Sequence, residues 1–231
     1  SADNVKNYAE RLISKVCDNS TQMTDMPVVL GMQEWPAEGS LRAQAIEAEL
    51  SYRDMKVVPG KTLGMGAKSV AVAYSSILGT CRPLTTTGDL SPESASSTKL
   101  LRPTDVMKSV LEEFRDSLSE DEMNKMVKTT AAKTMGIRLG ENLTVLVVHA
   151  KGPTSPAAAS CLARFILTMA EKLPSPWVAM SDTNMSSDGM YMAFELEVTS
   201  GGSSGSVQNS SSLVPVGGTD TTSKHRSSLH G

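Results

Sequence analysis

The chain has 231 residues, a formal net charge of −3 and a hydrophobic content of 39%. This length suits one sizeable domain with appendages, and the negative charge excludes an overall positive field that would attract nucleic acid or an anionic membrane. The sequence shows no apolar run long enough for a membrane span and no recognisable signal peptide, so we expect an intracellular or virion location.

The first sixty residues predict a helix, a short strand and one ambiguous segment. Apolar side chains recur at helical spacing from Asp3 to Val16, which predicts an N-terminal helical arm over residues 1–26. A short strand is expected at residues 27–32. Residues 41–58 fit both a helical stripe and a strand-like alternation; alanine and glutamate favour the helix, but both alternatives stay open.

The middle third is locally basic. Between Arg53 and Lys108 the sequence has eight basic and four acidic residues. A glycine-containing loop at residues 61–69 has the residue types of a phosphate cradle, but Met55 stands where a Walker A loop needs its first glycine. If this region contacts nucleic acid or phosphate, the expected contact residues are Arg53, Lys56, Lys61, Lys68 and Arg82.

Residues 70–78 predict an apolar strand or short helix, and residues 79–99 a long surface loop. A helix is then expected from Pro103 to Leu118. Ser119 and Glu122 form the pattern of a capping box, which predicts a second helix that continues to Met135.

The most structured stretch follows. Leu143 to Val148 is almost entirely apolar and mostly β-branched, which predicts a strand buried on both faces. A short polar turn leads to Ser155 and Pro156, a cap residue and a proline at the first helical position, and the predicted helix runs to Leu173.

Near the C-terminus, residues 174–180 predict a strand, and residues 191–198 alternate between apolar and other side chains, which indicates a second strand and a hairpin. The Ser/Gly-rich residues 200–231 predict a disordered tail. The expected fold is therefore a single α+β domain over residues 27–199, with a small central sheet and a C-terminal hairpin packed by helices.

His149 is the one histidine outside the predicted tail, and it ends the central strand, where catalytic residues often lie in α/β folds. Ser155, Thr154 and Cys161 are the nucleophiles that it would need, but no spacing brings them to it. The three cysteines show no metal-ligand spacing. The sequence thus predicts no catalytic residue, no metal site and no cofactor.

Two local resemblances concern phosphatases. The stretch VVHAKGPTSPAAAS resembles the signature loop of cysteine-dependent protein phosphatases, but Ala150 replaces the nucleophile and no arginine closes the loop, which implies an inactive relative. Residues 126–148 resemble the closing helix and strand of metal-dependent Ser/Thr phosphatases of the PP2C type, with Glu141 in place of the metal-binding aspartate. That resemblance implies a degenerate or divergent phosphatase-type domain.

The absence of a coherent active site favours a different function. The chain contains 14 methionines, whose soft side chains suit adaptable contacts between subunits. We therefore expect a non-catalytic structural protein that self-associates into a homo-oligomer, such as a viral coat, nucleocapsid or matrix-type subunit. Nucleic acid is a further expected partner through the basic middle segment, and the PP2C-like phosphatase is the alternative.

Overall fold

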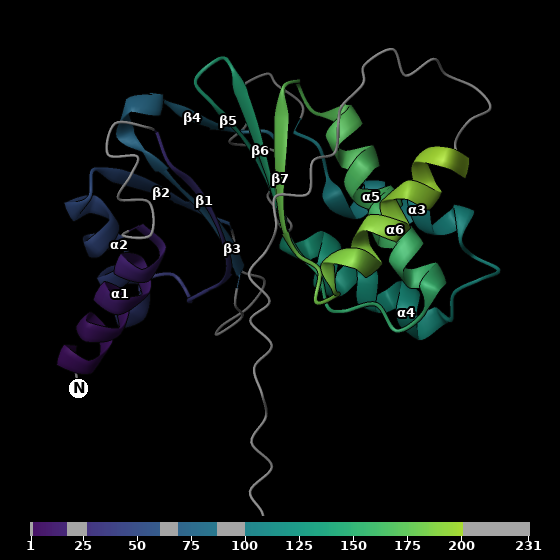
Figure 1. Ribbon diagram of the computed structural model, residues 1–231, viewed down its shortest axis with the longest axis horizontal. Coiled ribbons are helices and arrows are strands. Elements are labelled where there is room, and N and C mark those ends of the chain that lie inside the picture. The colour runs from purple at the N-terminus through teal and green to yellow at the C-terminus, as the bar shows by residue number, and fades with distance from the viewer. Residues whose placement is uncertain (1, 18–26, 61–68, 87–99, 201–231) are drawn as a thin grey trace, which may run out of the picture.

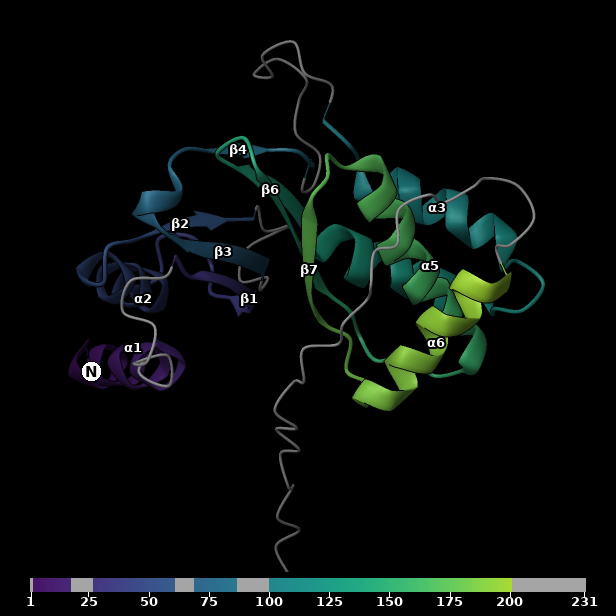
Figure 2. The same ribbon diagram turned by 45° about the horizontal axis from the view of Figure 1, so that its top comes forward.

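The computed structural model describes residues 2–17, 27–60, 69–86 and 100–200, which form two β-sheets packed face to face between two groups of helices (Figure 1). The first sheet has the strand order β1-β3-β2 and the second the order β4-β5-β6-β7. The predicted α+β class with a single domain is confirmed. The four layers, helix, sheet, sheet and helix, are clearest in Figure 2.

The first half of the chain builds the smaller sheet and the helices that cover it. Its elements are α1 (Ala2–Cys17), β1 (Val29–Trp35), α2 (Leu41–Tyr52), β2 (Met55–Pro59) and β3 (Ser69–Ser75). The ambiguous residues 41–58 contain both predicted alternatives in succession, a helix and then a strand. The chain reverses between them at Asp54, which has a left-handed backbone with φ of 56°.

Strand β3 is the centre of this sheet and pairs antiparallel with β1 and β2. Both of its faces are covered. Ala71 and Ala73 face α1 and α2, where Ile13 and Leu50 join the same apolar cluster. Val70 and Val72 face the second sheet. Burial on both faces explains why this segment is a continuous apolar run rather than an alternating one.

The second half builds the larger sheet and its helices. Its elements are the 3₁₀ turn η2 (Ser76–Leu78), β4 (Cys81–Pro83), α3 (Pro103–Glu113), α4 (Glu120–Lys125), the π turn η4 (Met126–Thr130), the 3₁₀ turn η5 (Ala131–Lys133), β5 (Thr134–Leu139), β6 (Leu143–His149), α5 (Pro156–Lys172), β7 (Trp177–Asp182) and α6 (Ser187–Ser200). Strand β6 is antiparallel to β5 and parallel to β7. Its central residues are fully buried, as the sequence predicts.

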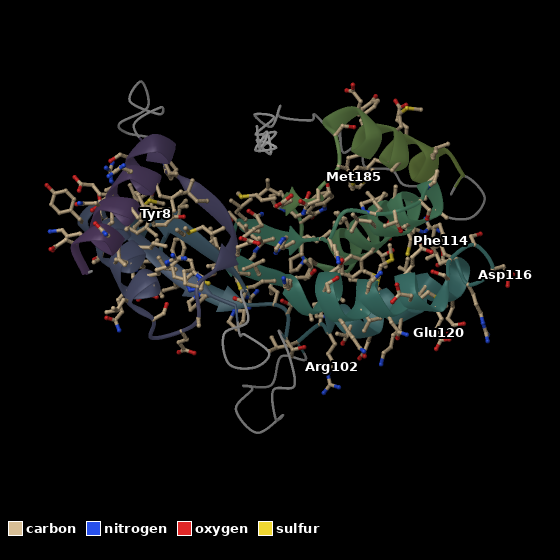
Figure 3. The ribbon with its side chains drawn as sticks, turned by 90° about the horizontal axis from the view of Figure 1, so that it is seen from below. Tyr8, Arg102, Phe114, Asp116, Glu120 and Met185 are labelled. Carbon is tan, nitrogen blue, oxygen red and sulfur yellow. The ribbon has the colours of Figure 1, made fainter. Side chains whose placement is uncertain are left out.

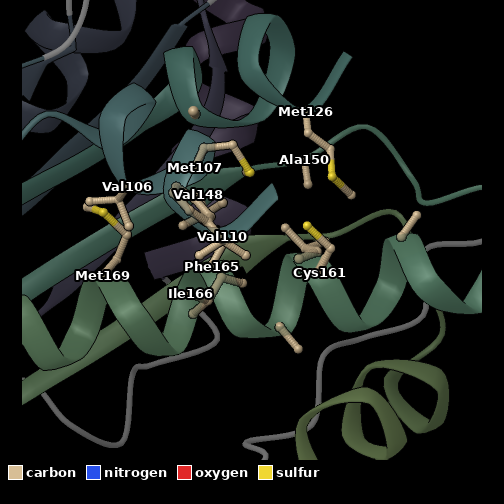
Figure 4. Close-up of a cluster of buried hydrophobic side chains, with 14 of the residues drawn as sticks. Val106, Met107, Val110, Met126, Val148, Ala150, Cys161, Phe165, Ile166 and Met169 are labelled. Carbon is tan, nitrogen blue, oxygen red and sulfur yellow. The ribbon is translucent and has the colours of Figure 1, made fainter. Parts of the chain in front are cut away.

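Helix α5 supplies most of the core on the outer face of this sheet (Figure 4). Cys161, Phe165 and Met169 lie at helical spacing and are completely buried. They belong to one cluster with side chains of β6, such as Val148, and of α3, such as Val110. The helix begins as predicted: Ser155 caps it by accepting a hydrogen bond from the Ala158 N–H at 3.2 Å, and Pro156 is its first residue.

The predicted C-terminal hairpin is wrong, because residues 191–198 lie in helix α6 and not in a strand. Their alternation has period two, but the side chains that are buried are Met190 and Ala193, three residues apart, with Phe194 packed beside them. Met192 and Leu196, which the strand pattern would bury, are mostly exposed. The contact with α5 therefore overrides the local pattern.

Two other predicted boundaries change. The helix expected to reach Met135 ends at Lys133, and Thr134–Leu139 forms strand β5, which pairs with β6 and is completely buried. The predicted loop at residues 79–99 contains strand β4, and its residues 87–99 lie outside the described part. Strand β5 lies between β4, which is about fifty residues earlier in the chain, and β6, and its burial between them explains why it is a strand.

The predicted N-terminal arm and C-terminal tail lie partly outside the described residues. Helix α1 is present, and its Ala9 and Ile13 pack with α2. Residues 18–26 and 201–231 are outside the described part, so the predicted domain boundaries and the disordered tail stay predictions. Within the residues that are described, no helix combines the length and apolar composition that crossing a bilayer requires.

Candidate functional site

The two sheets come into close contact where Gly31 of β1 lies against β6 and β7. A Cβ atom at Gly31 would lie 2.8 Å from Cβ of Met180 and 3.3 Å from Cγ2 of Val147. A few residues beyond this contact, β1 ends at Trp35, β6 at His149 and β7 at Asp182. All three strands end toward the lower centre of Figure 1. Carboxyl ends of neighbouring strands are where α/β sheets usually carry their ligands.

His149 and Asp182 are register partners at the ends of the parallel strands β6 and β7. The Ala150 N–H donates to the carbonyl of Asp182 at 2.8 Å and extends this pairing by one residue. Because side chains alternate along a strand, both residues lie on the face that Val147 and Met180 present to the first sheet. The imidazole of His149 is 9% exposed and its Nδ1 atom is buried, whereas Asp182 is exposed.

Asn184 follows in the turn after β7 and has a left-handed backbone with φ of 51°. Its N–H donates to Oδ1 of Asp182 at 3.1 Å, and its Nδ2 donates to the Ala150 carbonyl at 2.7 Å. These bonds orient the side chain and leave the amide oxygen as the group offered to a ligand. Gly152 packs so closely that a Cβ there would lie 2.8 Å from the Asn184 carbonyl oxygen.

Glu34 lies near the end of β1, in a β-bulge between Met32 and Trp35. With strict alternation Glu34 would follow Leu30 and Met32 onto the face covered by α1 and α2. Instead Trp35, which is 2% exposed, occupies that face. The bulge therefore turns Glu34 away from it, and the side chain of Glu34 is exposed. Its backbone is left-handed, with φ of 56°. Bulges beside functional sites often re-aim a side chain in this way.

We call Glu34, His149, Asp182 and Asn184 the strand-end site. Figure 3 looks onto this end of the molecule, with Met185, the residue after Asn184, labelled near the gap between the two halves. Two of the three non-glycine residues with positive φ in the described part belong to this site. Such conformations cost about 1–3 kcal/mol each and often mark functional positions.

The site offers two carboxylates, an amide oxygen and an imidazole. These oxygen donors suit a hard cation such as Mg²⁺, which needs only one or two protein carboxylates when water and substrate phosphates complete its shell. No three His, Cys, Asp or Glu side chains of the described residues lie close enough together to hold a metal ion, and this includes Glu34, His149 and Asp182. The arrangement therefore fits a cation shared with a substrate rather than one enclosed by protein.

The structure does not bring the expected nucleophiles to His149. Cys161 lies in the core beneath the other face of the sheet. The hydroxyls of Thr154 and Ser155 donate to a carboxylate oxygen of Glu122, at 2.7 and 3.1 Å. Burial raises the pKa of Cys81 to about 11, which keeps this thiol protonated and unreactive at neutral pH. Because these hydroxyls and thiols are not placed to attack a substrate, the nucleophile that the site could best use is a water molecule.

Glu141, the residue matched to the PP2C-type metal ligand, is exposed in the turn between β5 and β6. This turn is at the start of β6, whereas His149 is at its end. Its backbone carbonyl accepts a hydrogen bond from Nη2 of the buried Arg138. Glu141 thus lies away from the strand-end site, and the phosphatase resemblance stays a prediction.

The predicted basic contacts are spread over both sheets. Arg53 follows α2, where it pairs with Glu49 at 3.3 Å and donates to Ser14 Oγ at 2.8 Å. Lys56 lies exposed on β2 and Arg82 exposed on β4. Lys61 and Lys68 lie outside the described residues. Their described neighbours lie at the end where β1 finishes, because Ser69 pairs with Trp35 and the Gly60 N–H donates to the Val70 carbonyl.

Of the strand-end site, the sequence singles out only His149. Asp182 and Asn184 stand directly after a predicted strand, in a segment that the pattern marks as a turn, and this position is the signal that could have found them. Glu34 carries no such signal, since a bulge leaves no mark in the sequence. Comparison of the chain with protein-family models, curated proteins and solved structures gives no match.

Proposed function

We propose that the chain is a hydrolase of phosphate esters that uses a divalent cation at the strand-end site. The observation that carries this proposal is the pairing of His149 with Asp182 at the ends of β6 and β7, with the Asn184 amide oriented beside them. Glu34 stands near the end of β1, the strand that packs on β6 and β7 through Gly31. Two of these residues have left-handed backbones, and three of the four side chains are exposed to solvent, where a substrate could reach them.

Each residue has a chemical role in this proposal. Glu34 and Asp182 are the carboxylates that hold the cation, and the amide oxygen of Asn184 is a further ligand or substrate contact. The cation lowers the pKa of a bound water and neutralises charge that develops on a phosphate. His149 donates a hydrogen bond to a phosphate oxygen or takes a proton from the attacking water. The site needs no nucleophilic side chain.

Phosphate esters are favoured over carboxylic esters because of the cation. A cation held by only two protein carboxylates keeps open positions, and phosphate oxygens are the ligands that usually fill them. The PP2C-type resemblance implies the same reaction class but assigns the metal to Glu141. Here the cation lies instead at the other end of β6.

The test uses the purified chain with bis(p-nitrophenyl) phosphate and p-nitrophenyl phosphate, in Mg²⁺, Mn²⁺ or Ca²⁺ and with EDTA. Asp182→Asn, Glu34→Gln and His149→Ala should each lower turnover per folded molecule by about 100-fold or more. The changes at the exposed Asp182 and Glu34 should leave the melting temperature almost unchanged. Glu141→Gln is the matched control and should retain activity. Turnover that survives both EDTA and Asp182→Asn would contradict the proposal. Loss in Glu141→Gln alone would favour the PP2C-type alternative.

Self-association, the function expected from composition, is a second proposal. It is supported by large apolar side chains that α1 and α2 expose: Tyr8 is 54%, Leu41 65% and Tyr52 87% exposed. Light scattering of the full chain tests it, with Leu41→Glu and Tyr52→Glu as variants. A defined oligomer that these changes dissociate supports an assembly role, and a monomer at all concentrations contradicts it.

A further inference from the structure

The carboxylate of Glu122 is shared between two parts of the molecule. One oxygen, Oε2, accepts hydrogen bonds from the N–H and the hydroxyl of Ser119, at 3.0 and 2.8 Å, and so closes the capping box of α4. The other oxygen, Oε1, accepts from the hydroxyls of Thr154 and Ser155, at 2.7 and 3.1 Å. The capping box itself uses the bond from the Ser119 N–H and a second bond from the Glu122 N–H to Oγ of Ser119, so the bonds to Oε1 are not needed to cap the helix.

The second pair holds the loop between β6 and α5, residues 150–155. This loop begins directly after His149, and its first residue accepts the hydrogen bond from Nδ2 of Asn184 at 2.7 Å. Two residues later, Gly152 lies against the Asn184 backbone. Six residues of chain are therefore fixed at one end by the strand-end site and at the other by Glu122.

We infer that Glu122 is a positioning residue for the strand-end site, which acts through the hydroxyls of Thr154 and Ser155 on the loop that orients Asn184. Its effect on turnover rests on the proposed function, whereas its effect on the loop does not. The four donors that Glu122 accepts from hold its pKa at about 2, with the Thr154 hydroxyl the largest cause, so the carboxylate is ionised at any working pH.

The physical reason for an effect at a distance is geometric. Asn184 has a left-handed backbone, and the loop supplies two contacts that hold this residue in place. If residues 150–155 relax, the amide of Asn184 loses its fixed acceptor. Misplacement of a substrate-contacting group by about 1 Å can lower the rate up to roughly 100-fold.

A set of three variants separates positioning from helix capping. Thr154→Val removes the shorter of the two loop-side hydrogen bonds and keeps the side-chain shape, and Thr154→Ser restores the hydroxyl. Ser119→Ala removes the cap-side hydroxyl, which donates to Glu122 Oε2 and accepts from the Glu122 N–H, and leaves the loop-side bonds. The readouts are amide hydrogen exchange of residues 150–155, the imidazole NMR signals of His149, and kcat and KM for the phosphate ester that the wild type turns over.

Thr154→Val should speed exchange of residues 150–155 several-fold, shift the His149 signals and lower kcat about ten-fold. Thr154→Ser should match the wild type in all three readouts. Ser119→Ala should lower the melting temperature but leave the loop and kcat unchanged. Unchanged exchange and unchanged His149 signals in Thr154→Val would overturn the inference, and so would an unchanged kcat in an active protein with a loosened loop.

The readouts also separate this inference from the proposed function. If the wild type hydrolyses no phosphate ester, the proposed function fails, and the His149 signals then decide the inference. A shift in Thr154→Val that Thr154→Ser reverses supports positioning by Glu122, and no shift overturns it.

Discussion

Polar side chains from neighbouring strands lie near both ends of strand β6, and their environments at the two ends are opposite. At its start, the Arg138 guanidinium is 7% exposed and donates to Thr144 Oγ1 at 2.8 Å and to the carbonyls of Pro174 and Ser175 at 3.2 and 3.3 Å. At its end, Asp182, Asn184 and Glu34 are exposed, and two of them have strained backbones.

The difference distinguishes a structural polar cluster from the site that we propose to be functional. Arg138 is enclosed, and its hydrogen bonds run to backbone carbonyls and to the Thr144 hydroxyl within the protein, so they contribute to stability. The strand-end site does the reverse, because it keeps oxygen donors open to solvent at a conformational cost. Variants at the two ends should therefore affect stability and activity in opposite proportions.

The largest effect on stability is expected for a substitution in the middle of β6, between its two ends. Val147 is fully buried in the contact between the sheets, next to Gly31. Val147→Asp would bury an unpaired charge at a cost of several kcal/mol, comparable with the roughly 5–15 kcal/mol that stabilise a typical domain. We expect no cooperative melting transition in this variant, whereas Val147→Ala should still fold. A soluble Val147→Asp protein that melts cooperatively would contradict the burial of β6.

Replacement of Arg138 should destabilise the fold without affecting the strand-end site. Arg138→Met leaves buried carbonyls and the Thr144 hydroxyl without their donor, which should cost about 3 kcal/mol in the free energy of unfolding. Urea denaturation measures this loss. Phosphate-ester turnover per folded molecule should stay at the wild-type value. A variant that loses activity while it keeps its stability would remove the contrast between the two ends.

Glycine at the strained positions should give the opposite result. Glu34→Gly relieves a left-handed backbone and should raise stability by about 1 kcal/mol, while it abolishes turnover. Asp54→Gly is the matched control, because Asp54 has the same φ of 56° and lies in the turn between α2 and β2. It should gain similar stability and keep full activity. Thermal melts and turnover are measured together, and lower stability in Glu34→Gly would show that its backbone is not strained.

The basic middle predicts a smaller effect that depends on salt. If the substrate or partner is a nucleic acid, Lys61→Ala with Lys68→Ala should reduce the slope of log affinity against log salt by about two units, one for each phosphate that is no longer neutralised. Titration of a fluorescent oligonucleotide at several salt concentrations measures this slope. Absence of binding even at low salt would exclude nucleic acid as a partner and leave small phosphate esters as the substrate class.

The smallest expected effect is on the stability of the fold at low pH. Glu122 has a pKa lowered from 4.5 to about 2, so its contribution to stability is fully present above pH 4.5 and is lost as the pH falls toward 2. Glu122→Gln should therefore melt at a lower temperature than the wild type at pH 6, and the difference should vanish near pH 2. A difference in melting temperature that does not depend on pH would show that ionisation of Glu122 is irrelevant to the fold.

The sequence predicts the elements whose signals are local. The capping box at Ser119, the proline start of α5 and the apolar run of β6 are all found as expected. Elements decided by distant contacts are predicted poorly. Residues 191–198 alternate like a strand but pack as a helix on α5, and β5 is a strand because β4 and β6 flank it.

The candidate site is harder still to predict, because it depends on register and backbone conformation. His149 is visible as the end of an apolar strand. The pairing of β6 with β7 that brings Asp182 beside it, the bulge that turns Glu34, and the left-handed turn at Asn184 are properties of the assembled sheets. A single sequence contains no local pattern for any of them.

If a cation binds at the proposed strand-end site, the contact at Gly31 has a consequence for which ion is preferred. Glu34 belongs to one sheet and Asp182 to the other, and the sheets touch through a residue that has no side chain. A Gly31→Ala change would place a methyl group between the two sheets and would increase the distance between the two carboxylates. Mg²⁺ holds its oxygens at about 2.0–2.1 Å and Ca²⁺ at about 2.3–2.6 Å. The absence of a side chain at Gly31 would thus help to set the distance between the two carboxylates. That distance determines the radius of the cation that both can bind.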